Sequence, residues 1–469
     1  MQRITDLETY YNLNVSQLAD SNLICPNCGR EHSIPIKRVE SGTGLIEKLP
    51  TFISEEQFAE VRHIGVVYDR HIEEILDELF FKKFLDHKYT ITRIPLGKPG
   101  LLLEAATELG DQAAQALPGD VDFLIGVGSG VICDLTKWIA TKGNLHYLIM
   151  GTAASMNAYT SITGTMTENN VKSTRWLNPA RAVLMDSALV ASAPHEMTGA
   201  GVGDLLARQV ANADWMLSHL IRGSYFCPVP FQMMATFQDQ LMPVIGELQK
   251  KDFDAMQKLS DAILASGYSM TILDGETSPS SGSEHVISHF FDFQHELFGK
   301  PKNLHGEQVG IGTIIMSTAF DIFQKIDPAE LDIEQIVRRR LSLEEVKQNI
   351  LQTFGDYHSV LDQVVEAKRI PDDQFRGYIS NIIDSWENIM QELQPYLMPA
   401  DLIRQTMKAA GGHTDLVSVQ RTSDDALQAL LFGSHYRQRY TILDLFWELG
   451  LFPDYAPIIL EKSGVLDKT

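Results

Sequence analysis

Residues 121–141 read VDFLIGVGSGVICDLTKWIAT, and this stretch decides the fold class. An apolar run at 121–125 leads into the glycine turn 126–130, and a helical pattern follows from Val131. A strand, a glycine turn and a helix start, in that order, offer backbone N–H groups and a helix dipole to a diphosphate. The spacing is G-x-G-x-G rather than the G-x-G-x-x-G dinucleotide fingerprint, so a plain tight turn stays an alternative.

The alternation of short apolar runs with helical patterns extends to both sides of this stretch. Further short apolar runs alternate with helical patterns, and they lie at 63–68, 89–96, 145–150 and 181–185. Continuous apolar strands between helices predict a parallel sheet covered on both faces, here a Rossmann-like α/β domain. Beyond residue 185 long helical patterns predict an all-α C-terminal domain. We therefore expect an N-terminal extension over 1–35, the α/β domain over 36–192 and the helical domain over 193–469.

The composition narrows the possible partners and location. The chain has 469 residues, with 39 basic against 61 acidic side chains and a net charge of −22. Such a surface repels phosphate backbones and anionic lipids, so we expect no nucleic-acid partner. We find no signal peptide and no run of about 18 apolar residues, which predicts no membrane insertion. Four cysteines are too few for a disulfide framework, and the cytoplasm is the expected location.

Two acidic residues of the α/β domain have two interpretations each. Asp69 follows the run 63–68 and could accept hydrogen bonds from ribose hydroxyls at the carboxyl edge of the sheet, or cap the next helix. Asp134 and Lys137 lie one helical turn apart after the glycine turn. They could contact a cofactor or form a surface ion pair.

Three histidines form a candidate metal site. His285 and His289 are four residues apart, hence on one helix face, and His305 follows in the string LHGE. Three imidazoles could bind Zn²⁺, with ordinary core or surface histidines as the alternative. The residue after His285 is valine, so the H-E-x-x-H pattern of zinc proteases is absent.

Cys25-Pro-Asn-Cys28 resembles half of a structural zinc site, with His32 as a possible third ligand. A complete structural site needs four ligands, and the sequence holds no second C-x-x-C. A turn with two thiols is therefore the favoured interpretation of this motif.

Five strings taken together resemble the sn-glycerol-1-phosphate dehydrogenase group, which includes the bacterial AraM-like proteins. That group lies within the superfamily of iron-type alcohol dehydrogenases, glycerol dehydrogenase and dehydroquinate synthase. The strings are GVGSGVICDLTKW (126–138), TAASMNAYTS (152–161), APHEMTGAGVGDLLA (193–207), SGSEHVISH (281–289) and LHGEQVGIGT (304–313). The resemblance extends to residues 25–39 and 435–452, but residues 322–400 match nothing in the group.

The resemblance implies a dehydroquinate synthase-like fold, with a nucleotide-binding α/β domain, a helical domain and a cleft for nicotinamide cofactor and one divalent metal. It implies that Asp204, His285 and His305 ligate the metal and that His289 acts beside substrate and nicotinamide. Two imidazoles and a carboxylate favour Zn²⁺, with Ni²⁺ or Fe²⁺ as alternatives. The cofactor, NAD or NADP, would contact a set of residues in the α/β domain: Asp69, Gly128, Ser129, Gly130, Asp134, Thr152 and Ser155.

One position departs from the group. Asn157 stands where most members have aspartate, so an amide that donates and accepts replaces an acceptor. We expect Asn157 to be a catalytic and substrate-contacting residue, with a tolerated substitution as the alternative. Lys172 is the first candidate for the substrate phosphate, and Arg437 and Arg439 are alternatives that could instead form structural ion pairs.

These observations predict a metal-dependent, NAD(P)-linked oxidoreductase that interconverts dihydroxyacetone phosphate and sn-glycerol 1-phosphate, a reaction of phospholipid metabolism. A glycerol or other polyol dehydrogenase is the first alternative. A dehydroquinate synthase-like lyase and a non-catalytic homologue are further alternatives. The expected partner is a small polyol phosphate, and a homodimer is expected from the resemblance.

Overall fold

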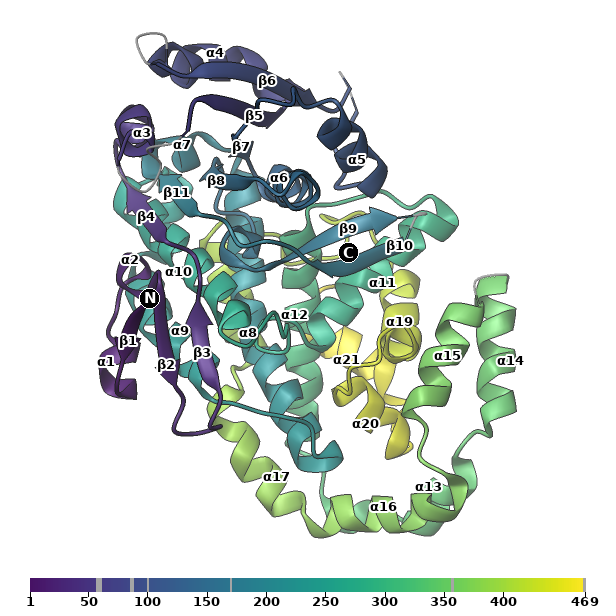
Figure 1. Cartoon of the computed structure of the whole chain (residues 1–469). Coiled ribbons are helices and arrows are strands. Elements are labelled where there is room, and N and C mark those ends of the chain that lie inside the picture. The colour runs from purple at the N-terminus through teal and green to yellow at the C-terminus, as the bar shows by residue number, and fades with distance from the viewer. Residues whose placement is uncertain (56–60, 85–87, 99–100, 169–170, 356–357, 467–469) are drawn as a thin grey trace. The chain divides into compact units, whose positions relative to one another are not determined.

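The computed structural model describes residues 1–55, 61–84, 88–98, 101–168, 171–355 and 358–466 (Figure 1). The chain divides into two compact units. The α/β unit comprises Met1–Gly201 and Pro228–Thr277, and the helical unit comprises Val202–Cys227 and Ser278–Thr469. The domain boundaries expected after residues 35 and 192 remain a prediction.

A six-stranded parallel sheet forms the centre of the α/β unit, in the order β4-β11-β8-β7-β5-β6. Five of its strands are those expected from the apolar runs, and the predicted fold class is confirmed. Every residue of β7 and β8 except His146 is buried, as expected for strands covered on both faces. The strands are β4 (Arg38–Gly42), β5 (His63–Asp69), β6 (Thr90–Leu96), β7 (Phe123–Gly128), β8 (His146–Gly151) and β11 (Ala182–Asp186).

Helices pack around this sheet and extend the α/β unit. The apolar core joins β5, β7 and β8 to α3 through residues such as Leu49, Tyr68 and Ile125. The α-helices of this unit are α1 (Leu7–Tyr11), α2 (Val15–Leu18), α3 (Leu45–Ile53), α4 (Glu73–Leu79), α5 (Thr107–Gln115), α6 (Gly130–Gly143), α7 (Ser187–Ser192), α9 (Val229–Leu241) and α10 (Phe253–Thr271).

Two smaller sheets were not predicted from the sequence. A three-stranded sheet contains β1 (Gln2–Ile4), β2 (Ser21–Ile24) and β3 (Glu31–Ile34), and a hairpin contains β9 (Thr163–Glu168) and β10 (Val171–Trp176). The first three strands are three or four residues long, too short for a recognisable alternation.

The helical unit is built around α11 and α12, which pack against each other. The long α8 (His195–Arg222) begins in the α/β unit and continues into the helical unit. The other α-helices are α11 (Ser283–Phe298), α12 (His305–Phe323), α13 (Ile333–Arg339), α14 (Leu343–Phe354), α15 (His358–Lys368), α16 (Asp372–Asp384), α17 (Trp386–Leu393), α18 (Ala400–Ala409), α19 (Ser423–Phe432), α20 (Ile442–Glu448) and α21 (Tyr455–Ser463). None of the described helices has the length and apolarity that a membrane span requires.

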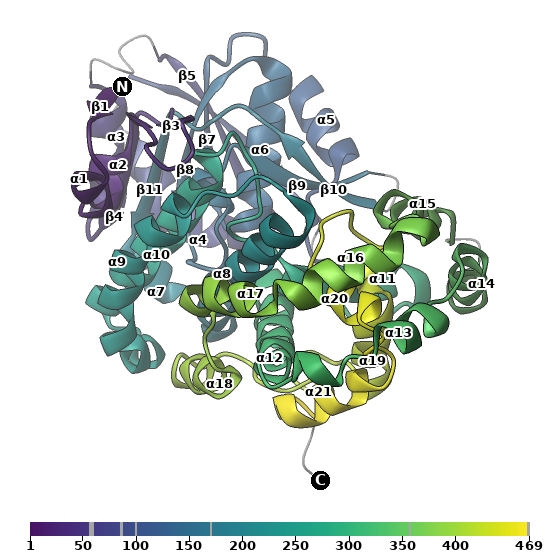
Figure 2. The same ribbon diagram turned by 90° about the horizontal axis from the view of Figure 1, so that it is seen from below.

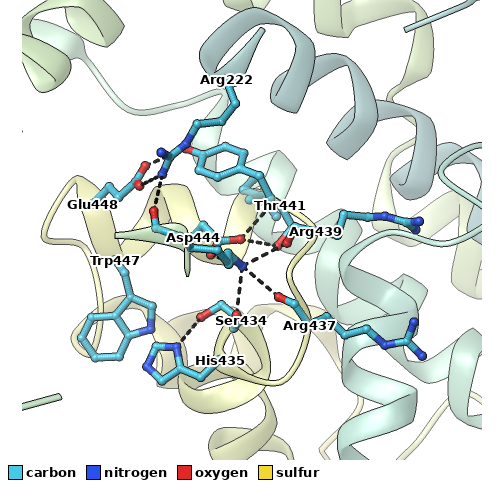
Figure 3. Close-up of polar contacts among 12 residues, drawn as sticks. Arg222, Ser434, His435, Arg437, Arg439, Thr441, Asp444, Trp447 and Glu448 are labelled. Carbon is cyan, nitrogen blue, oxygen red and sulfur yellow. Dashed lines mark hydrogen bonds and ion pairs between the residues drawn. The ribbon is translucent and has the colours of Figure 1, made fainter. Parts of the chain in front are cut away.

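Residues 322–400, which resemble nothing in the group, form α13 to α17, with α16 and α17 end to end (Figure 2). Lys368 at the end of α15 attaches this segment to the rest of the unit. Its Nζ forms an ion pair with Asp444 and donates to the carbonyl oxygens of Ser434, Arg437 and Arg439 at 2.9, 3.2 and 3.0 Å (Figure 3). The ammonium group is thus fully engaged by segment 434–444.

Candidate metal and nucleotide sites

Three helices bring the predicted metal ligands together within the helical unit. Asp204 comes from α8, His285 from the first turn of α11, and His305 is the first residue of α12. Nε2 of His285 lies 3.5 Å from Oδ1 of Asp204, and Nε2 of His305 lies 3.9 Å from the same oxygen. The three ligand atoms lie within 4.8 Å of one another, a spacing that one metal ion could bridge.

Glycines allow α8 and α12 to approach closely enough to form this cluster. A Cβ atom on Gly203, the residue before Asp204, would lie 2.3 Å from the carbonyl oxygen of Gly306 and 3.1 Å from Cα of Gly310. Because Gly306 directly follows His305, the close contact lies beside the ligands themselves. The glycines in GVGD and HGEQVG are therefore explained by helix packing, a reason that the sequence analysis did not supply.

A second layer of carboxylates holds the His285 ring. Oε1 of the buried Glu284 lies 2.7 Å from Nδ1 of His285 and accepts the backbone N–H of Gly282 at 2.7 Å. Oδ2 of Asp214 accepts the N–H of Ser283 at 2.6 Å, which fixes the start of α11. With Nδ1 held by Glu284, Nε2 is directed towards Asp204. Such outer carboxylates orient a ligating imidazole and raise its basicity.

The electrostatics of His285 suit a bound cation. Burial disfavours the charged imidazole, but hydrogen bonds with Asp204 and Glu284 outweigh burial and raise the pKa of His285 to about 9. Two buried carboxylates thus stabilise positive charge at this ring. A divalent ion among Asp204, His285 and His305 would supply that charge, so the donor set fits the metal that the resemblance implies.

His289 lies one turn further along α11, with its ring centre 5.7 Å from that of His305. Burial, and next the positive charge of Arg437, hold the pKa of His289 well below its usual value, so its imidazole is neutral. Its Nδ1 lies 3.7 Å from Oδ2 of Asp292. A neutral imidazole beside the ligand cluster is placed to exchange a proton with a bound molecule.

A cavity of about 250 Å³ adjoins His289 and contains both candidate arginines. It is lined by Ser281, Gly282, Val286, His289, Arg437, Gln438 and Arg439. Burial and the neighbouring Arg439 lower the pKa of Arg437, and the charges of Tyr436 and Asp292 only partly oppose this shift. In Figure 3 both guanidinium groups point away from the ion pair of Arg222 with Glu448. The cavity therefore presents positive charge that an anion would stabilise.

Within the α/β unit, three neighbouring parallel strands carry predicted cofactor residues at their carboxyl ends. Asp69 ends β5, Gly128 ends β7, and Thr152 follows β8. The N–H of Thr152 donates to the carbonyl of Gly128 at 3.1 Å. Ligands of open parallel sheets bind at this edge.

The glycine turn starts α6 as the sequence analysis expected. Ser129 precedes the helix in an extended conformation, and Gly130 is its first residue. A Cβ atom on Gly128 would lie 2.6 Å from Cβ of Ile132, so only glycine allows the strand to turn directly into the helix. The exposed N–H groups of this helix start remain the predicted diphosphate site.

The two acidic residues have definite roles in the structure. Oδ1 of Asp69 accepts the N–H of His71 at 2.9 Å, so Asp69 caps the short 3₁₀ helix Arg70–Ile72. Asp134 and Lys137 are buried, and the suggestion of a surface pair is wrong. Lys137 Nζ lies 3.6 Å from Oδ1 of Asp134 and donates to the carbonyl of Thr163 at 2.8 Å, because a buried ammonium needs several acceptors.

Asn157 contacts another residue of its own unit. Its Nδ2 donates to Oγ of Ser266 in α10 at 3.1 Å, whereas an aspartate would have to accept from that hydroxyl. Ser155, two residues earlier, is buried. The side chain of Lys172, the first phosphate candidate, lies outside the described residues, although its backbone pairs with Thr167 in the β9–β10 hairpin.

A larger cavity of about 580 Å³ lies elsewhere in the helical unit and is lined by none of the three site histidines. Three of the cations that line it form ion pairs: Arg222 with Glu448, Lys368 with Asp444 and Arg340 with Asp372. Its size alone therefore does not make it the reaction site.

The cysteine motif has one more potential ligand in the structure than its sequence pattern predicts. Sγ of Cys28 lies 3.3 Å from Nε2 of His32, and a third thiol, that of Cys227, joins Cys25, Cys28 and His32 in one cluster. Burial lowers the pKa of His32 to about 4. Cys227 stands alone in the sequence, so its local pattern contains no signal for this cluster.

Several known proteins are similar to this chain in sequence. The family model for iron-containing alcohol dehydrogenase matches residues 40–194. A glycerol-1-phosphate dehydrogenase [NAD(P)+] of Halalkalibacterium halodurans is 28% identical over 295 residues, which cover 62% of this chain and 73% of that protein. The chain is therefore similar to the iron-containing alcohol dehydrogenases and, among them, to glycerol-1-phosphate dehydrogenases.

Two further similarities extend over nearly the whole chain. A glycerol-1-phosphate dehydrogenase [NAD(P)+] of Bacillus licheniformis is 24% identical over 445 residues, covering 91% of this chain and 92% of that protein. The crystal structure of glycerol dehydrogenase from Schizosaccharomyces pombe matches with a TM-score of 0.54 and 16% identity, covering 91% of each chain. The resemblance of the sequence motifs and the predicted fold are thereby confirmed. Both of these glycerol-1-phosphate dehydrogenases are NAD(P)+ enzymes by name. The roles of individual site residues remain predictions.

Proposed function

We propose that this protein is a metal-dependent NAD(P)-linked dehydrogenase that interconverts dihydroxyacetone phosphate and sn-glycerol 1-phosphate. One observation carries the proposal: a carboxylate and two imidazoles converge beside a neutral histidine and a cavity containing two arginines. The names of the relatives support the same substrate. The arrangement combines a place for a metal, a proton carrier and a place for a phosphate in one unit.

Asp204, His285 and His305 would hold the metal, and Zn²⁺ is the ion we propose. Three protein ligands leave a coordination position open, as catalytic rather than structural sites require. A metal bound there supplies a Lewis acid that polarises a carbonyl oxygen of the substrate. Glu284 keeps the His285 ring in the orientation that this requires.

His289 would supply the proton. Its imidazole is neutral because burial and Arg437 disfavour the charged form, so it can accept a proton from an alcohol or relay one to a ketone oxygen. The Asp292 carboxylate, 3.7 Å away, would stabilise the imidazolium that forms transiently.

Arg437 and Arg439 would bind the phosphate. An anionic ligand offsets both the repulsion between the two guanidinium groups and the cost of burying Arg437. Planar guanidinium donors match phosphate oxygens in pairs, which gives orientation as well as affinity. Lys172, from the resemblance, would be a further contact.

The nicotinamide cofactor would bind along the edge formed by β5, β7 and β8. Gly128, Ser129 and Gly130 would present N–H groups to its diphosphate, and Asp69 would face the ribose. Thr152 and Ser155 would line the nicotinamide, beside Asn157. A nicotinamide held there would supply a carrier for the hydride of the reaction. Asp134, buried at the base of α6, would support this binding region.

The test is oxidation of NADH and NADPH by purified, zinc-loaded protein with dihydroxyacetone phosphate, compared with dihydroxyacetone. We expect the phosphate ester to have the higher kcat/KM, and chelator treatment to abolish the rate. Preference for dihydroxyacetone would reassign the protein to the polyol dehydrogenases. Absence of oxidation with either ketone would contradict the proposal.

We also propose a homodimer located in the cytoplasm. Light scattering coupled to size-exclusion chromatography tests the oligomeric state directly. A mass of about one chain at micromolar concentration would contradict the dimer.

A further inference from the structure

We propose that Cys25, Cys28, His32 and Cys227 bind a structural zinc ion that is separate from the metal of the dehydrogenase site. The four ligand atoms lie within 4.8 Å of one another. The two proposed metal sites share no residue. The structural site therefore stands whether or not the proposed dehydrogenase activity is correct.

The first three ligands come from one hairpin of the α/β unit. Between β2 and β3 the chain reverses in a tight turn, in which the N–H of Cys25 donates to Arg30 O at 2.9 Å and the N–H of Gly29 donates to Cys25 O at 2.9 Å. Gly29 has φ of +72°, a conformation in which glycine is favoured. The turn brings Cys28 Sγ to 3.3 Å from Nε2 of His32, which lies on β3.

The fourth ligand is placed by its covalent neighbour. Cys227 is bonded to Pro228, the residue at which the chain re-enters the α/β unit and which caps α9. The N-terminal segment holds α9, since Thr236 Oγ1 donates to the carbonyl of Tyr11 at 2.9 Å. Because Cys227 joins the cluster and is bonded to Pro228, the start of α9 lies beside the cysteine hairpin.

The dimensions and burial suit a closed tetrahedral site. With Zn–S bonds of about 2.3 Å and Zn–N bonds of about 2.0 Å, a sulfur and a nitrogen ligand of one tetrahedron are roughly 3.5 Å apart and two sulfur ligands roughly 3.8 Å apart. The Cys28–His32 distance of 3.3 Å is close to the first of these values. Cys25, His32 and Cys227 are buried and Cys28 is half-buried, so a bound ion would have little access to solvent.

The donor set also distinguishes this site from the dehydrogenase site. Three thiolates and one imidazole complete a four-coordinate zinc site and leave no open position for a substrate. Thiolates bind zinc far more strongly than they bind magnesium or manganese, which prefer oxygen ligands. We therefore expect this ion to resist a chelator treatment that empties the site of Asp204, His285 and His305.

The ion would fasten the N-terminal hairpin to the start of α9. The hairpin strands are short, and a three-stranded sheet of this size gains little stability by itself. A metal that joins residues 25–32 to residue 227 closes a long loop and stabilises the folded state.

Zinc content per chain tests the proposal on the full-length protein. After treatment with a mild chelator, we expect the wild type and His305→Ala to retain about one zinc each. The double variant Cys28→Ser with His305→Ala should retain none. Cys133→Ser is the matched control, because Cys133 is a buried cysteine of the same unit outside the cluster, and it should leave the retained zinc unchanged.

A second measurement needs no cysteine variant and covers the case in which Cys28→Ser does not fold. Titration of the native His305→Ala protein with a mercurial reagent should release the retained zinc as thiols react, in proportion to the reagent added. Absence of zinc from chelated His305→Ala protein, with Cys25, Cys28 and Cys227 all reactive, would overturn the proposal. Detection of a disulfide among residues 25, 28 and 227 would also overturn it.

Discussion

Nε2 of His285 lies 3.5 Å from Oδ1 of Asp204, although the two residues come from different helices. Each side chain is less than a tenth exposed, and Glu284 holds the opposite face of the imidazole at 2.7 Å. A buried carboxylate and an imidazole oriented by Glu284 therefore lie close enough to bind one ion. His305 at the start of α12 completes the three ligands.

His305→Ala should lose the chelator-sensitive metal and lower kcat/KM for dihydroxyacetone phosphate by at least about 100-fold, because two ligands hold the ion more weakly than three. Circular dichroism should show an unchanged fold, since His305 is half-buried at a helix start. His195→Ala, at an exposed histidine of α8, is the control and should keep metal and activity. Full metal content in His305→Ala would show that His305 is not a ligand.

Arg437→Met should raise KM for dihydroxyacetone phosphate by about 10- to 100-fold, because a charge-assisted hydrogen bond contributes about 1.5–3 kcal/mol. Kinetics with dihydroxyacetone should change much less, since that ketone has no phosphate. The comparison of the two ketones separates phosphate binding from a general defect. An equal loss with both ketones would contradict a role of Arg437 in phosphate binding.

Asn157→Asp should shift the ratio of kcat/KM between dihydroxyacetone phosphate and dihydroxyacetone by about tenfold, because an acceptor-only side chain changes the pairing with substrate hydroxyls. Ser266→Ala is the control, since it removes the partner of Asn157 without altering the amide. Steady-state kinetics of both variants separate the two effects. An unchanged ratio in Asn157→Asp would place Asn157 outside the substrate site.

Asp261→Asn should stabilise the protein above pH 6. Burial, offset in part by the hydrogen bond from Ser41, raises the pKa of Asp261 to about 6. The folded state therefore retains a proton that the unfolded chain loses near pH 4, and stability falls as pH rises from about 4 to 6. The neutral amide avoids this loss, so the free energy of unfolding should rise by about 1–2 kcal/mol at pH 8 and should not change at pH 4. The melting temperature should rise accordingly at pH 8 only.

Asp254→Asn on the same helix is the control for that experiment, because Asp254 is largely exposed and pairs with Lys258. Its melting temperature should be nearly unchanged at both pH values. A gain of equal size at pH 4 and pH 8 in Asp261→Asn would contradict the shifted pKa as its cause.

Glu448→Gln should destabilise the helical unit by about 3 kcal/mol, because it leaves the guanidinium of Arg222 without its charged partner (Figure 3). Glu448 also accepts a hydrogen bond from Tyr378 of α16 at 2.8 Å, so residues 322–400 should loosen as well. Urea denaturation measures the change. Glu366→Gln is the control, because it breaks the more exposed pair with Lys347 and should have little effect on the free energy of unfolding. Similar losses of unfolding free energy in both variants would contradict the special role of the buried pair.

The sequence predicts those parts of the molecule that have a local pattern. The strands around the glycine turn alternate with helices, and each of the five apolar runs identified a strand of the main sheet. The site histidines lie in strings that resemble a known group. Arg437 and Arg439 were named as alternatives, but only the structure shows that they share a cavity with His289.

What the sequence did not predict depends on contacts between distant segments. β4 has five residues and joins the sheet only by pairing with β11. Cys227 has no neighbouring cysteine, and it joins Cys25 and Cys28 only after the chain has folded. The burial of Lys137 likewise follows from carbonyl oxygens that the fold brings to it.

The most direct test of the metal-dependent dehydrogenase is to restore activity to chelated protein by titration with Zn²⁺, following oxidation of NADH and NADPH by dihydroxyacetone phosphate. We predict that the rate rises from near zero in proportion to the zinc taken up and saturates at about one added equivalent per chain. His305→Ala should show no such recovery. A full rate in the chelated protein, with no response to added metal, would contradict the metal site as the centre of the reaction.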